Sequence, residues 1–406
     1  MGASKRAKRA EEAEKRVKPV LFECPSLPKW ELMVYFVYLV AHLSWGWYQI
    51  FRVSRNYVWG RGGLNSSSYL PFFGPRTKDI TNFEWQKYRP FAMQLVPALF
   101  GHFLVFNLSE KLLAKRSRLA WEVTTTAYSL LACAWIFGPK SVVVCVGFGI
   151  FVFAITRFTR SKTAVWASTI SCLWAMLRGL FTVKMTDPYY TSLYYSHLLN
   201  GYNLLCFISY NLEYINGKTR KQDEPFLKGL WRQFYYAFYM PYLISVIVIY
   251  PDFEKQMEER GEVRRDWKRI LFFGARIAFW YLFADFVLHF FYFEAILHDK
   301  KVMYQVSLDT LAALGYAVGQ FFHLKYVVIF GIPNFFAMLD GMQPAVDMCI
   351  LSNCHHSIRS TGTFGIMSAI LCNGITAYQR TQTVPNSELG RLTKLEDLIP
   401  LGWVPI

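Results

Sequence analysis

The chain has 406 residues, of which 53% are hydrophobic, 18% aromatic and only 18% charged. Soluble domains are usually about 45–50% apolar and about 25% charged, so this composition excludes an ordinary soluble fold. The formal net charge is +16. We assign this charge to helix ends and lipid headgroups and predict no nucleic-acid partner, because no basic-aromatic recognition motif occurs.

The first 27 residues form a basic tail in which Lys and Arg outnumber Glu11, Glu12 and Glu14. We expect this tail to be cytosolic. It is charged and broken by prolines before any apolar run begins, which is not the pattern of a signal peptide. The first apolar helix is therefore expected to act as the membrane anchor.

Apolar segments of membrane-spanning length follow along the chain. A bilayer core is crossed by about 20 apolar residues in a helix. We predict membrane helices at residues 32–50, 91–108, 119–137, 164–183, 189–215, 234–250, 270–297 and 306–339, with a shorter, tilted or re-entrant element at 142–155. Pro333 predicts that the last segment holds two elements. The fold class is thus all-α, a polytopic membrane helical bundle of roughly eight to ten membrane elements.

Polar stretches separate or interrupt these spans. Residues 53–89 are predicted to be a Gly- and Ser-rich loop, and residues 251–269 a charged segment with an amphipathic surface helix. The segment 189–215 is rich in Tyr and Asn, so we expect it to face protein or a cavity and not lipid.

Ionisable side chains inside membrane helices are costly, so each indicates a partner or a function. Asp285 and His289 are four residues apart and share one face of a helix. They are candidates for a proton relay, a metal pair or the wall of a polar chamber, and the alternative is a structural hydrogen-bonded pair between packed helices. Two ligands alone do not make a metal site, so none is predicted. Asp340 lies where the last apolar segment ends, as a surface cap or at a chamber mouth.

Single histidines in apolar stretches are interpreted as hydrogen-bond donors between helices. They are His42, His102, His197 and His323.

Separate sequence motifs occur in a fixed order over residues 28–344. They are PKWEL at 28–32, YQIFRVSR at 48–55, DITNFEW at 79–85, FYMP at 238–241, PDFEKQM at 251–257, and KYVVIFGIP at 325–333 running into LDGMQP at 339–344. In order and spacing these motifs resemble the hedgehog acyltransferase branch of the membrane-bound O-acyltransferase (MBOAT) family.

The resemblance implies an MBOAT-like helical bundle around a membrane-crossing chamber in the endoplasmic reticulum membrane. A long-chain acyl-CoA, palmitoyl-CoA, would be the co-substrate, with no further cofactor, and would enter from the cytosolic side. The N-terminal cysteine of a secreted hedgehog-type protein would enter from the lumen and become acylated as an amide. Asp340 matches the active-site carboxylate in the family's Asp-Gly-x-x-Pro motif.

The family pattern stops after residue 344. The Trp-His-Gly-type motif that carries the family's catalytic histidine is absent, and residues 345–406 are predicted to be a divergent, largely irregular tail produced by a shifted reading frame or an alternative exon. The chain is thus divided into the basic tail 1–27, an incomplete MBOAT-like membrane domain 28–344 and the tail 345–406. We expect this form to be inactive as an acyltransferase. The alternatives are an inactive family member that binds acyl-CoA or the client as a regulator, and a transporter or channel.

Overall fold

The computed structural model describes most of the predicted membrane domain. Its described residues are 28–56, 64–65, 68–70, 73–114, 116–179, 191–217, 225–243, 248–261, 265–342, 356–359, 375–378 and 404–405. The predictions for the basic tail, residues 1–27, lie outside them.

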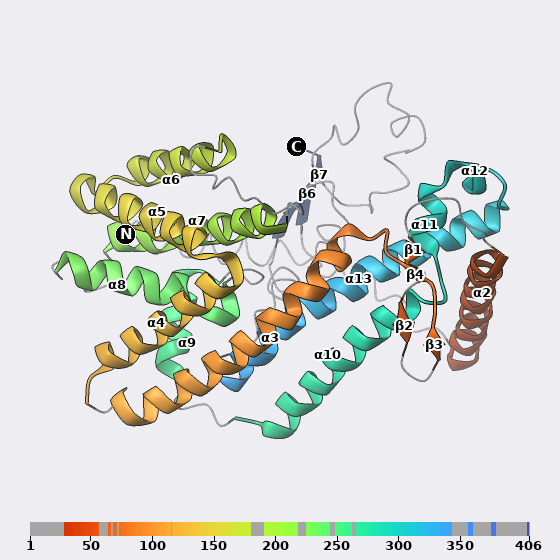
Figure 1. Cartoon of the computed structure of the whole chain (residues 1–406), viewed down its shortest axis with the longest axis horizontal. Coiled ribbons are helices and arrows are strands. Elements are labelled where there is room, and N and C mark those ends of the chain that lie inside the picture. The colour runs from red at the N-terminus through yellow and green to blue at the C-terminus, as the bar shows by residue number, and fades with distance from the viewer. Residues whose placement is uncertain are drawn as a thin grey trace, which may run out of the picture. The chain divides into compact units, whose positions relative to one another are not determined.

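Helices dominate the described residues (Figure 1). They are α2 (Lys29–Asn56), α3 (Phe83–Ser109), a π-helical turn (Glu110–Ala114), α4 (Arg118–Phe137), α5 (Pro139–Thr159), α6 (Lys162–Leu177), α7 (Thr191–Asn216), α8 (Phe226–Ala237), a 3-10 turn (Met240–Tyr242), α9 (Tyr250–Glu259), α10 (Trp267–Val287), α11 (Phe293–His298), α12 (Lys300–Met303) and α13 (Leu308–Leu339).

Strands are few and short. In the segment between α2 and α3, β1 (Leu64–Asn65) pairs antiparallel with β4 (Lys78–Asp79), and β2 (Tyr69–Leu70) pairs antiparallel with β3 (Gly74–Pro75). In the tail, β5 (His356–Arg359), β6 (Ile375–Tyr378) and β7 (Val404–Pro405) form a parallel sheet in that order. The predicted tail therefore contains regular structure at these three places.

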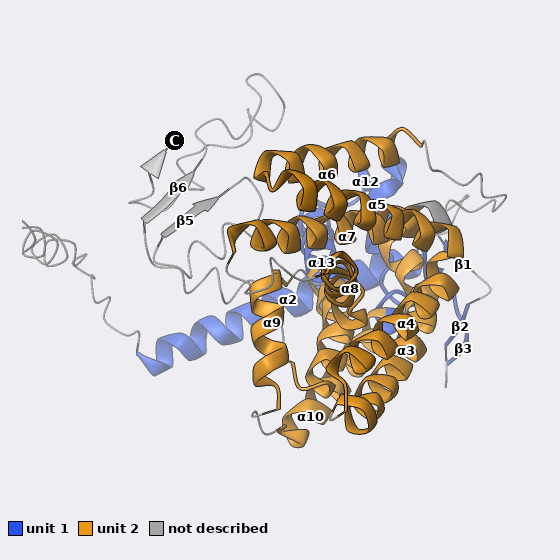
Figure 2. Ribbon diagram, turned by 90° about the vertical axis from the view of Figure 1, so that its left-hand side faces the viewer, with its two compact units in different colours: residues 1–82, 285–322 blue, residues 83–284, 323–406 orange. Residues whose placement is uncertain are grey.

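The chain divides into two compact units, which Figure 2 shows in different colours. Unit 1 comprises residues 1–82 and 285–322, and unit 2 comprises residues 83–284 and 323–406. The helices α10 and α13 contribute residues to both units.

In unit 1, the short helix α11 packs against α2 and β4. The Asp79 carboxylate anchors this contact, because it accepts hydrogen bonds from the backbone N–H groups of Thr81 and Ala295 at 2.9 and 3.0 Å. The second bond satisfies an N–H of the first turn of α11, which has no partner within its own helix. Trp47 of α2 meets Phe291 edge to face.

In unit 2, α5 packs against α4, α6, α7 and α8. Gly138, at φ +84°, ends α4, and Pro139 begins α5 with a ring already set to the helical φ. A buried amide pair joins three helices: Asn211 donates to Gln233, which donates to the carbonyl of Gly149 at 3.0 Å. Asn200 and Asn203 of α7 are also buried, which confirms that this helix turns its amides toward protein.

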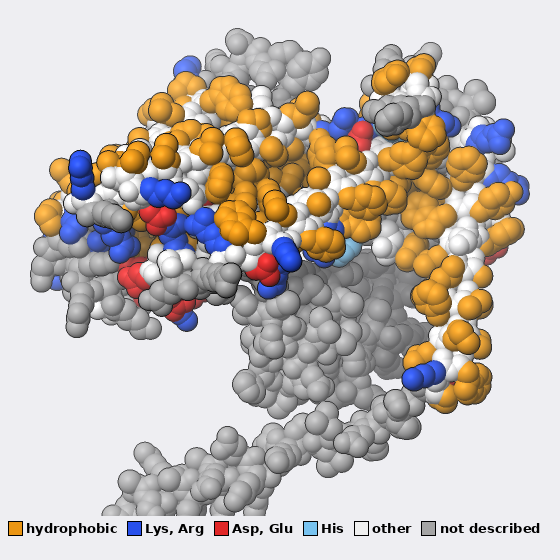
Figure 3. All heavy atoms as spheres, turned by 90° about the horizontal axis from the view of Figure 1, so that it is seen from below, with side chains coloured by type: hydrophobic (Ala, Val, Ile, Leu, Met, Phe, Trp, Pro, Cys, Tyr) orange, Lys and Arg blue, Asp and Glu red, His pale blue; other side chains and the backbone are white. Residues whose placement is uncertain are grey.

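Among the described residues, four helices are long and apolar enough to cross a membrane. They are Phe83–Ala114, which joins α3 to the π-helical turn, Pro139–Thr159, Trp267–Val287 and Leu308–Leu339. Apolar side chains cover much of the surface in Figure 3, and Lys and Arg gather in patches between them. On α2, large apolar side chains from Leu32 to Val40 are exposed. A soluble protein would bury such a surface, whereas a bilayer covers it. The predicted all-α polytopic membrane fold is confirmed.

Several predicted element boundaries are wrong. The predicted span 234–250 is not one helix, because α8 ends at Ala237 and a 3-10 turn follows over Met240–Tyr242. Pro241 explains this break, since proline lacks an N–H and disfavours helical geometry in the residue before it. The predicted span 270–297 ends at Val287 in the structure.

Other helices are longer than predicted. The segment 142–155, predicted to be short, belongs to the 21-residue helix α5. The segment 306–339, predicted to hold two elements, is the single helix α13, with Pro333 inside it. Packed neighbours can re-satisfy the backbone groups that proline frees in a membrane helix. The surface helix predicted within 251–269 is confirmed as α9, with Tyr250, Phe253 and Met257 buried along one face.

Candidate functional site

The last turn of α13 places Asp340 in the interior of unit 2. The N–H of Gly341 bonds to the carbonyl of Met338 at 3.1 Å, and the N–H of Met342 bonds to that of Ala337 at 2.9 Å. This pairing is the Schellman motif, with Asp340 as the C-cap and Gly341 in the left-handed conformation at φ +86°. The Asp-Gly pair therefore ends the helix and fixes the direction of the Asp340 side chain.

Both oxygens of the Asp340 carboxylate accept hydrogen bonds, and the residue is fully buried. The Tyr239 hydroxyl donates to Oδ2 at 2.8 Å, and the Asn107 amide donates to Oδ1 at 3.1 Å. Burial, and then the negative charge of Asp340, raise the pKa of the Tyr239 phenol well above its ordinary range. Tyr239 therefore stays protonated and keeps donating.

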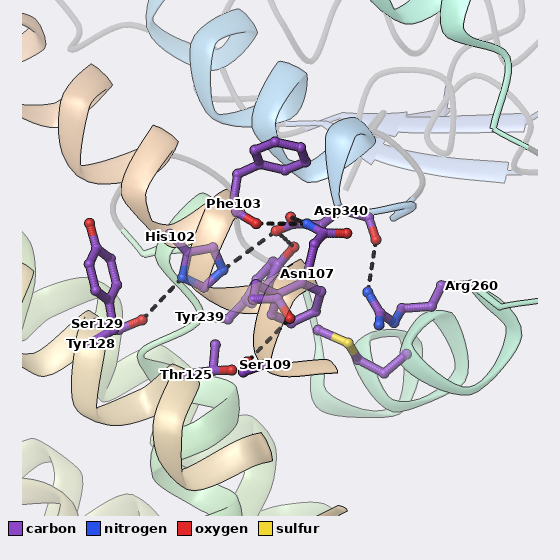
Figure 4. Close-up of polar contacts among 12 residues, drawn as sticks. His102, Phe103, Asn107, Ser109, Thr125, Tyr128, Ser129, Tyr239, Arg260 and Asp340 are labelled. Atoms are coloured by element: carbon purple, nitrogen blue, oxygen red, sulfur yellow. Dashed lines mark hydrogen bonds and ion pairs between the residues drawn. The ribbon is translucent and has the colours of Figure 1, made fainter. Parts of the chain in front are cut away.

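The His102 side chain of α3 contacts the same carboxylate. Its Nε2 is 3.4 Å from Asp340 Oδ2, within ion-pair distance, although the geometry does not meet the criteria for a hydrogen bond. Its Nδ1 lies 3.3 Å from the Ser129 hydroxyl on α4. Figure 4 shows the imidazole between Ser129 and Asp340. An acid and an imidazole thus share one fully buried site.

Two arginines hold the backbone of the same turn. Arg260 Nη1 donates to the Asp340 carbonyl at 2.9 Å, and Arg265 donates to it at 3.3 Å and to the Asn107 side-chain oxygen at 3.1 Å. These bonds satisfy a carbonyl at a helix C-terminus, where cations are favoured. The bond from Arg265 also fixes the orientation of the Asn107 amide, so that its NH₂ faces Asp340.

Arg260 is itself enclosed. It forms an ion pair with Glu110, and its guanidinium lies over the rings of Phe106 and Trp121, at 4.4 and 5.0 Å from their centres. Glu110 begins the π-helical turn that follows α3. Such wide turns are frequent at functional sites because they re-aim side chains within a helix.

The position of Asp340 is unfavourable for a negative charge. The C-terminus of a helix carries a partial negative charge, and burial removes the water that would solvate a carboxylate. The hydroxyl, the amide and the two guanidinium groups offset these costs. The arrangement can therefore hold a carboxylate beside an imidazole, which together can accept a proton and stabilise a developing positive charge.

The other two predicted site residues lie in unit 1. Asp285 forms an ion pair with Lys78, which is only 2% exposed. His289 lies in the turn after α10, with Nδ1 2.8 Å from the Asp285 carbonyl and Nε2 3.0 Å from the Ser68 hydroxyl. The two residues are adjacent, as their spacing predicts, and each has a structural partner. His289 also lines a polar cavity of unit 1, whereas Asp285 is not among its lining residues.

The sequence pointed to Asp340 but not to most of its partners. The sequence alone predicts a structural role for His102 and places Arg260 and Arg265 in a charged surface segment, whereas the structure brings all three to Asp340. Tyr239 lies within the FYMP motif at 238–241, and this was the one available signal for it.

Comparison with known proteins supports the resemblance seen in the motifs. The chain is 26% identical over 331 residues to the protein-cysteine N-palmitoyltransferase HHAT of Mus musculus and 26% identical over 331 residues to the protein-cysteine N-palmitoyltransferase Rasp of Drosophila melanogaster. These matches cover 78% and 80% of this chain. The predicted resemblance to the hedgehog acyltransferase branch is confirmed. The chain spans 65% and 64% of the length of these relatives. No protein-family profile matches it.

A second, shorter similarity is to a different class of enzyme. The chain is 38% identical over 64 residues to galactoside alpha-(1,2)-fucosyltransferase 2 of Sus scrofa, which covers 16% of this chain and 19% of that relative.

Proposed function

We propose that this chain is a protein acyltransferase of the hedgehog acyltransferase type. The acyl donor would be palmitoyl-CoA, and the acceptor would be the N-terminal cysteine of a secreted hedgehog-type protein. The endoplasmic reticulum membrane is the proposed location. Support comes from the two palmitoyltransferases that match about four fifths of the chain, and from the buried Asp340 in the Asp-Gly-x-x-Pro motif.

The reaction moves an acyl group and a proton. The amine nitrogen of the acceptor attacks the carbonyl carbon of the thioester, so that a C–N bond forms and the C–S bond breaks. The nitrogen releases a proton, and the departing coenzyme A thiolate takes one up. We assign acceptance of that proton to the Asp340–His102 pair, and we assign the orientation of the carboxylate to Tyr239 and Asn107.

The single observation that carries this assignment is the fully buried contact between His102 and Asp340, in which Nε2 lies 3.4 Å from Oδ2. The family's own catalytic histidine belongs to a motif that the sequence lacks after residue 344. In the structure, the imidazole of His102 on α3 lies 3.4 Å from the Asp340 carboxylate. The expectation that this form is inactive is therefore tested by an assay of palmitate transfer.

The test is palmitate transfer by the full chain in proteoliposomes, from palmitoyl-CoA to a peptide with an N-terminal cysteine, followed by mass spectrometry. We expect transfer by the wild type and its loss in Asp340→Asn. Asp309→Asn, the same change at an exposed position of the same helix, is the matched control and should keep the activity. Full activity of Asp340→Asn would refute the role of Asp340, and an unchanged pH profile in His102→Gln would refute that of His102.

Two alternatives give different results in the same preparation. A regulator that binds without catalysis would bind a non-hydrolysable palmitoyl-CoA and transfer nothing. A transporter or channel would show solute flux in proteoliposomes without acyl-CoA binding.

The fucosyltransferase similarity bears on the tail. It covers 64 residues, close to the length of residues 345–406, and the palmitoyltransferase motifs occupy residues 28–344. We infer that it lies on the tail. A shifted reading frame would not produce a sequence 38% identical to another protein, so a match at this place favours the alternative exon over the shifted reading frame. Mass spectrometry of the native protein tests whether residues 28–344 and 345–406 belong to one polypeptide. A peptide that spans residues 344 and 345 would establish this. Detection of the two parts only in separate proteins would refute it.

A further inference from the structure

Unit 1 contains a polar cavity of about 750 Å³ at the C-terminal end of α2. It is built by α2, the short strands and the turn after α10. Its lining residues are Phe51, Ser54, Arg55, Leu64, Phe73, Pro75, Arg76, Thr77, His289, Phe290 and Tyr292. The proposed acyl-transfer residues all belong to unit 2, and none of them lines this cavity.

The charge of the cavity is positive. Arg55 and Arg76 line it, and no acidic side chain does among the described residues. The sequence from residue 56 to residue 77 contains no Asp or Glu. Nearby acids are already engaged, since Asp285 pairs with Lys78 and Asp79 accepts two backbone N–H groups. Among the described residues, neither arginine has an acidic partner.

The walls of the cavity are fixed by contacts between distant segments. The Arg76 guanidinium lies 4.3 Å from the centre of the Phe290 ring, and the backbone N–H of Arg76 donates to the Ser68 carbonyl at 2.8 Å. Tyr292 donates from its backbone N–H to the Ser54 hydroxyl at 3.0 Å and from its own hydroxyl to the Thr77 carbonyl at 3.3 Å.

His289 adds an oriented ring. Its Nδ1 faces the Asp285 carbonyl, which can only accept, so Nδ1 carries the proton. Nε2 lies 3.0 Å from the Ser68 hydroxyl. The two arginines give the cavity positive charge that does not depend on the protonation of this ring.

The chemistry of the lining selects a phosphate group. Guanidinium groups present planar, paired N–H donors that match the oxygens of phosphate, and they remain charged at all physiological pH values. Phe51, Phe73 and Phe290 give the same cavity an apolar side. Phe73 is 56% exposed, and its ring centre lies 5.9 Å from that of Phe290, over which the Arg76 guanidinium lies, so exposed apolar surface adjoins an arginine.

We propose that Arg55 and Arg76 bind the phosphate of an anionic phospholipid headgroup, while the aromatic side of the cavity contacts the glycerol and upper acyl region of the lipid. This inference goes beyond the proposed acyl transfer and does not depend on it. A free phosphate-bearing small molecule is the other source of the same chemistry, and the test separates the two.

The test uses the full chain in dodecyl maltoside micelles, titrated with dioleoylphosphatidylglycerol, with bound lipid counted by native mass spectrometry. The double variant Arg55→Gln/Arg76→Gln should raise the apparent Kd at least about tenfold, equivalent to about 1.4 kcal/mol. The control Arg52→Gln/Lys300→Gln removes the same charge from exposed positions of unit 1 outside the cavity, and its Kd should stay within about twofold of the wild type.

Equal weakening in both double variants would show general charge attraction and overturn the proposal, as would unchanged binding in the cavity variant. Arg55→Lys/Arg76→Lys keeps the charge and the fold but removes the paired donors, so we expect intermediate binding. Wild-type binding by this variant would refute recognition by the guanidinium groups. In a parallel titration, sn-glycerol 3-phosphate should bind far more weakly than the lipid. Equal affinity would overturn the lipid as the ligand and favour a soluble phosphate compound.

Discussion

The hydrogen bond from Tyr239 to Asp340 makes a quantitative prediction about the site. Both side chains are buried, and the hydroxyl lies 2.8 Å from Oδ2. A hydrogen bond to a charged group contributes about 1.5–3 kcal/mol, and one between neutral groups about 0.5–1.5 kcal/mol. Tyr239→Phe removes the first kind in the wild type and only the second kind in an Asp340→Asn background.

The two substitutions should therefore be coupled by about 1–2 kcal/mol in a double-mutant cycle. The assay is equilibrium unfolding in mixed micelles of dodecyl maltoside and sodium dodecyl sulfate, followed by tryptophan fluorescence, for the wild type, both single variants and the double variant. Tyr210→Phe is the matched control, because this buried tyrosine donates to the Gly229 carbonyl at 2.8 Å and not to Asp340. Its combination with Asp340→Asn should be additive.

Additivity of Tyr239→Phe and Asp340→Asn within about 0.5 kcal/mol would refute the contact and, with it, the orientation of the carboxylate. A fully buried carboxylate with donors on both oxygens cannot be replaced without a cost to folding.

Two further predictions concern packing and the predicted chamber residues. Gly331→Ala should lower stability by about 1–3 kcal/mol in the same unfolding assay, because the new methyl group would overlap Ile277 of α10, whereas Gly319→Ala on the same helix enters open space and should not destabilise. Equal effects of the two would refute the packing of α10 on α13. Asp285→Asn should destabilise by about 3–5 kcal/mol, because it removes the negative charge that pairs with the buried Lys78. Unchanged stability with lost acyl transfer would instead place Asp285 in the chamber.

The local part of the fold was accessible from the sequence, because it depends on hydropathy and helix-ending residues. The Asp-Gly pair at 340–341 predicted the end of α13, and the apolar runs predicted most long helices. The prediction that Pro333 divides the last segment into two elements is wrong, because proline breaks helices in water more strictly than in a packed membrane bundle.

The composition of the site was not accessible, because its contacts join residues far apart in the chain. Asn107 and Asp340 are separated by 233 positions, and Tyr239 and Asp340 by 101. No local periodicity encodes which histidine will face a given carboxylate. His102 looked like His42 or His197 in the sequence, and only the packing of α3 against the end of α13 distinguishes it.

The charge of Asp340 is the strongest structural reason to regard the site as more than a helix cap. An asparagine at this position could accept from Tyr239 and would not bring a negative charge to the negative end of α13. The chain instead carries an acid there, enclosed beside Arg260 and Arg265 and in contact with an imidazole. Burying a charge away from water carries a desolvation cost that a neutral residue would avoid. The proposed acyl transfer gives this charge a role. The Asp340 carboxylate, together with His102, would accept the proton that the amine of the acceptor releases.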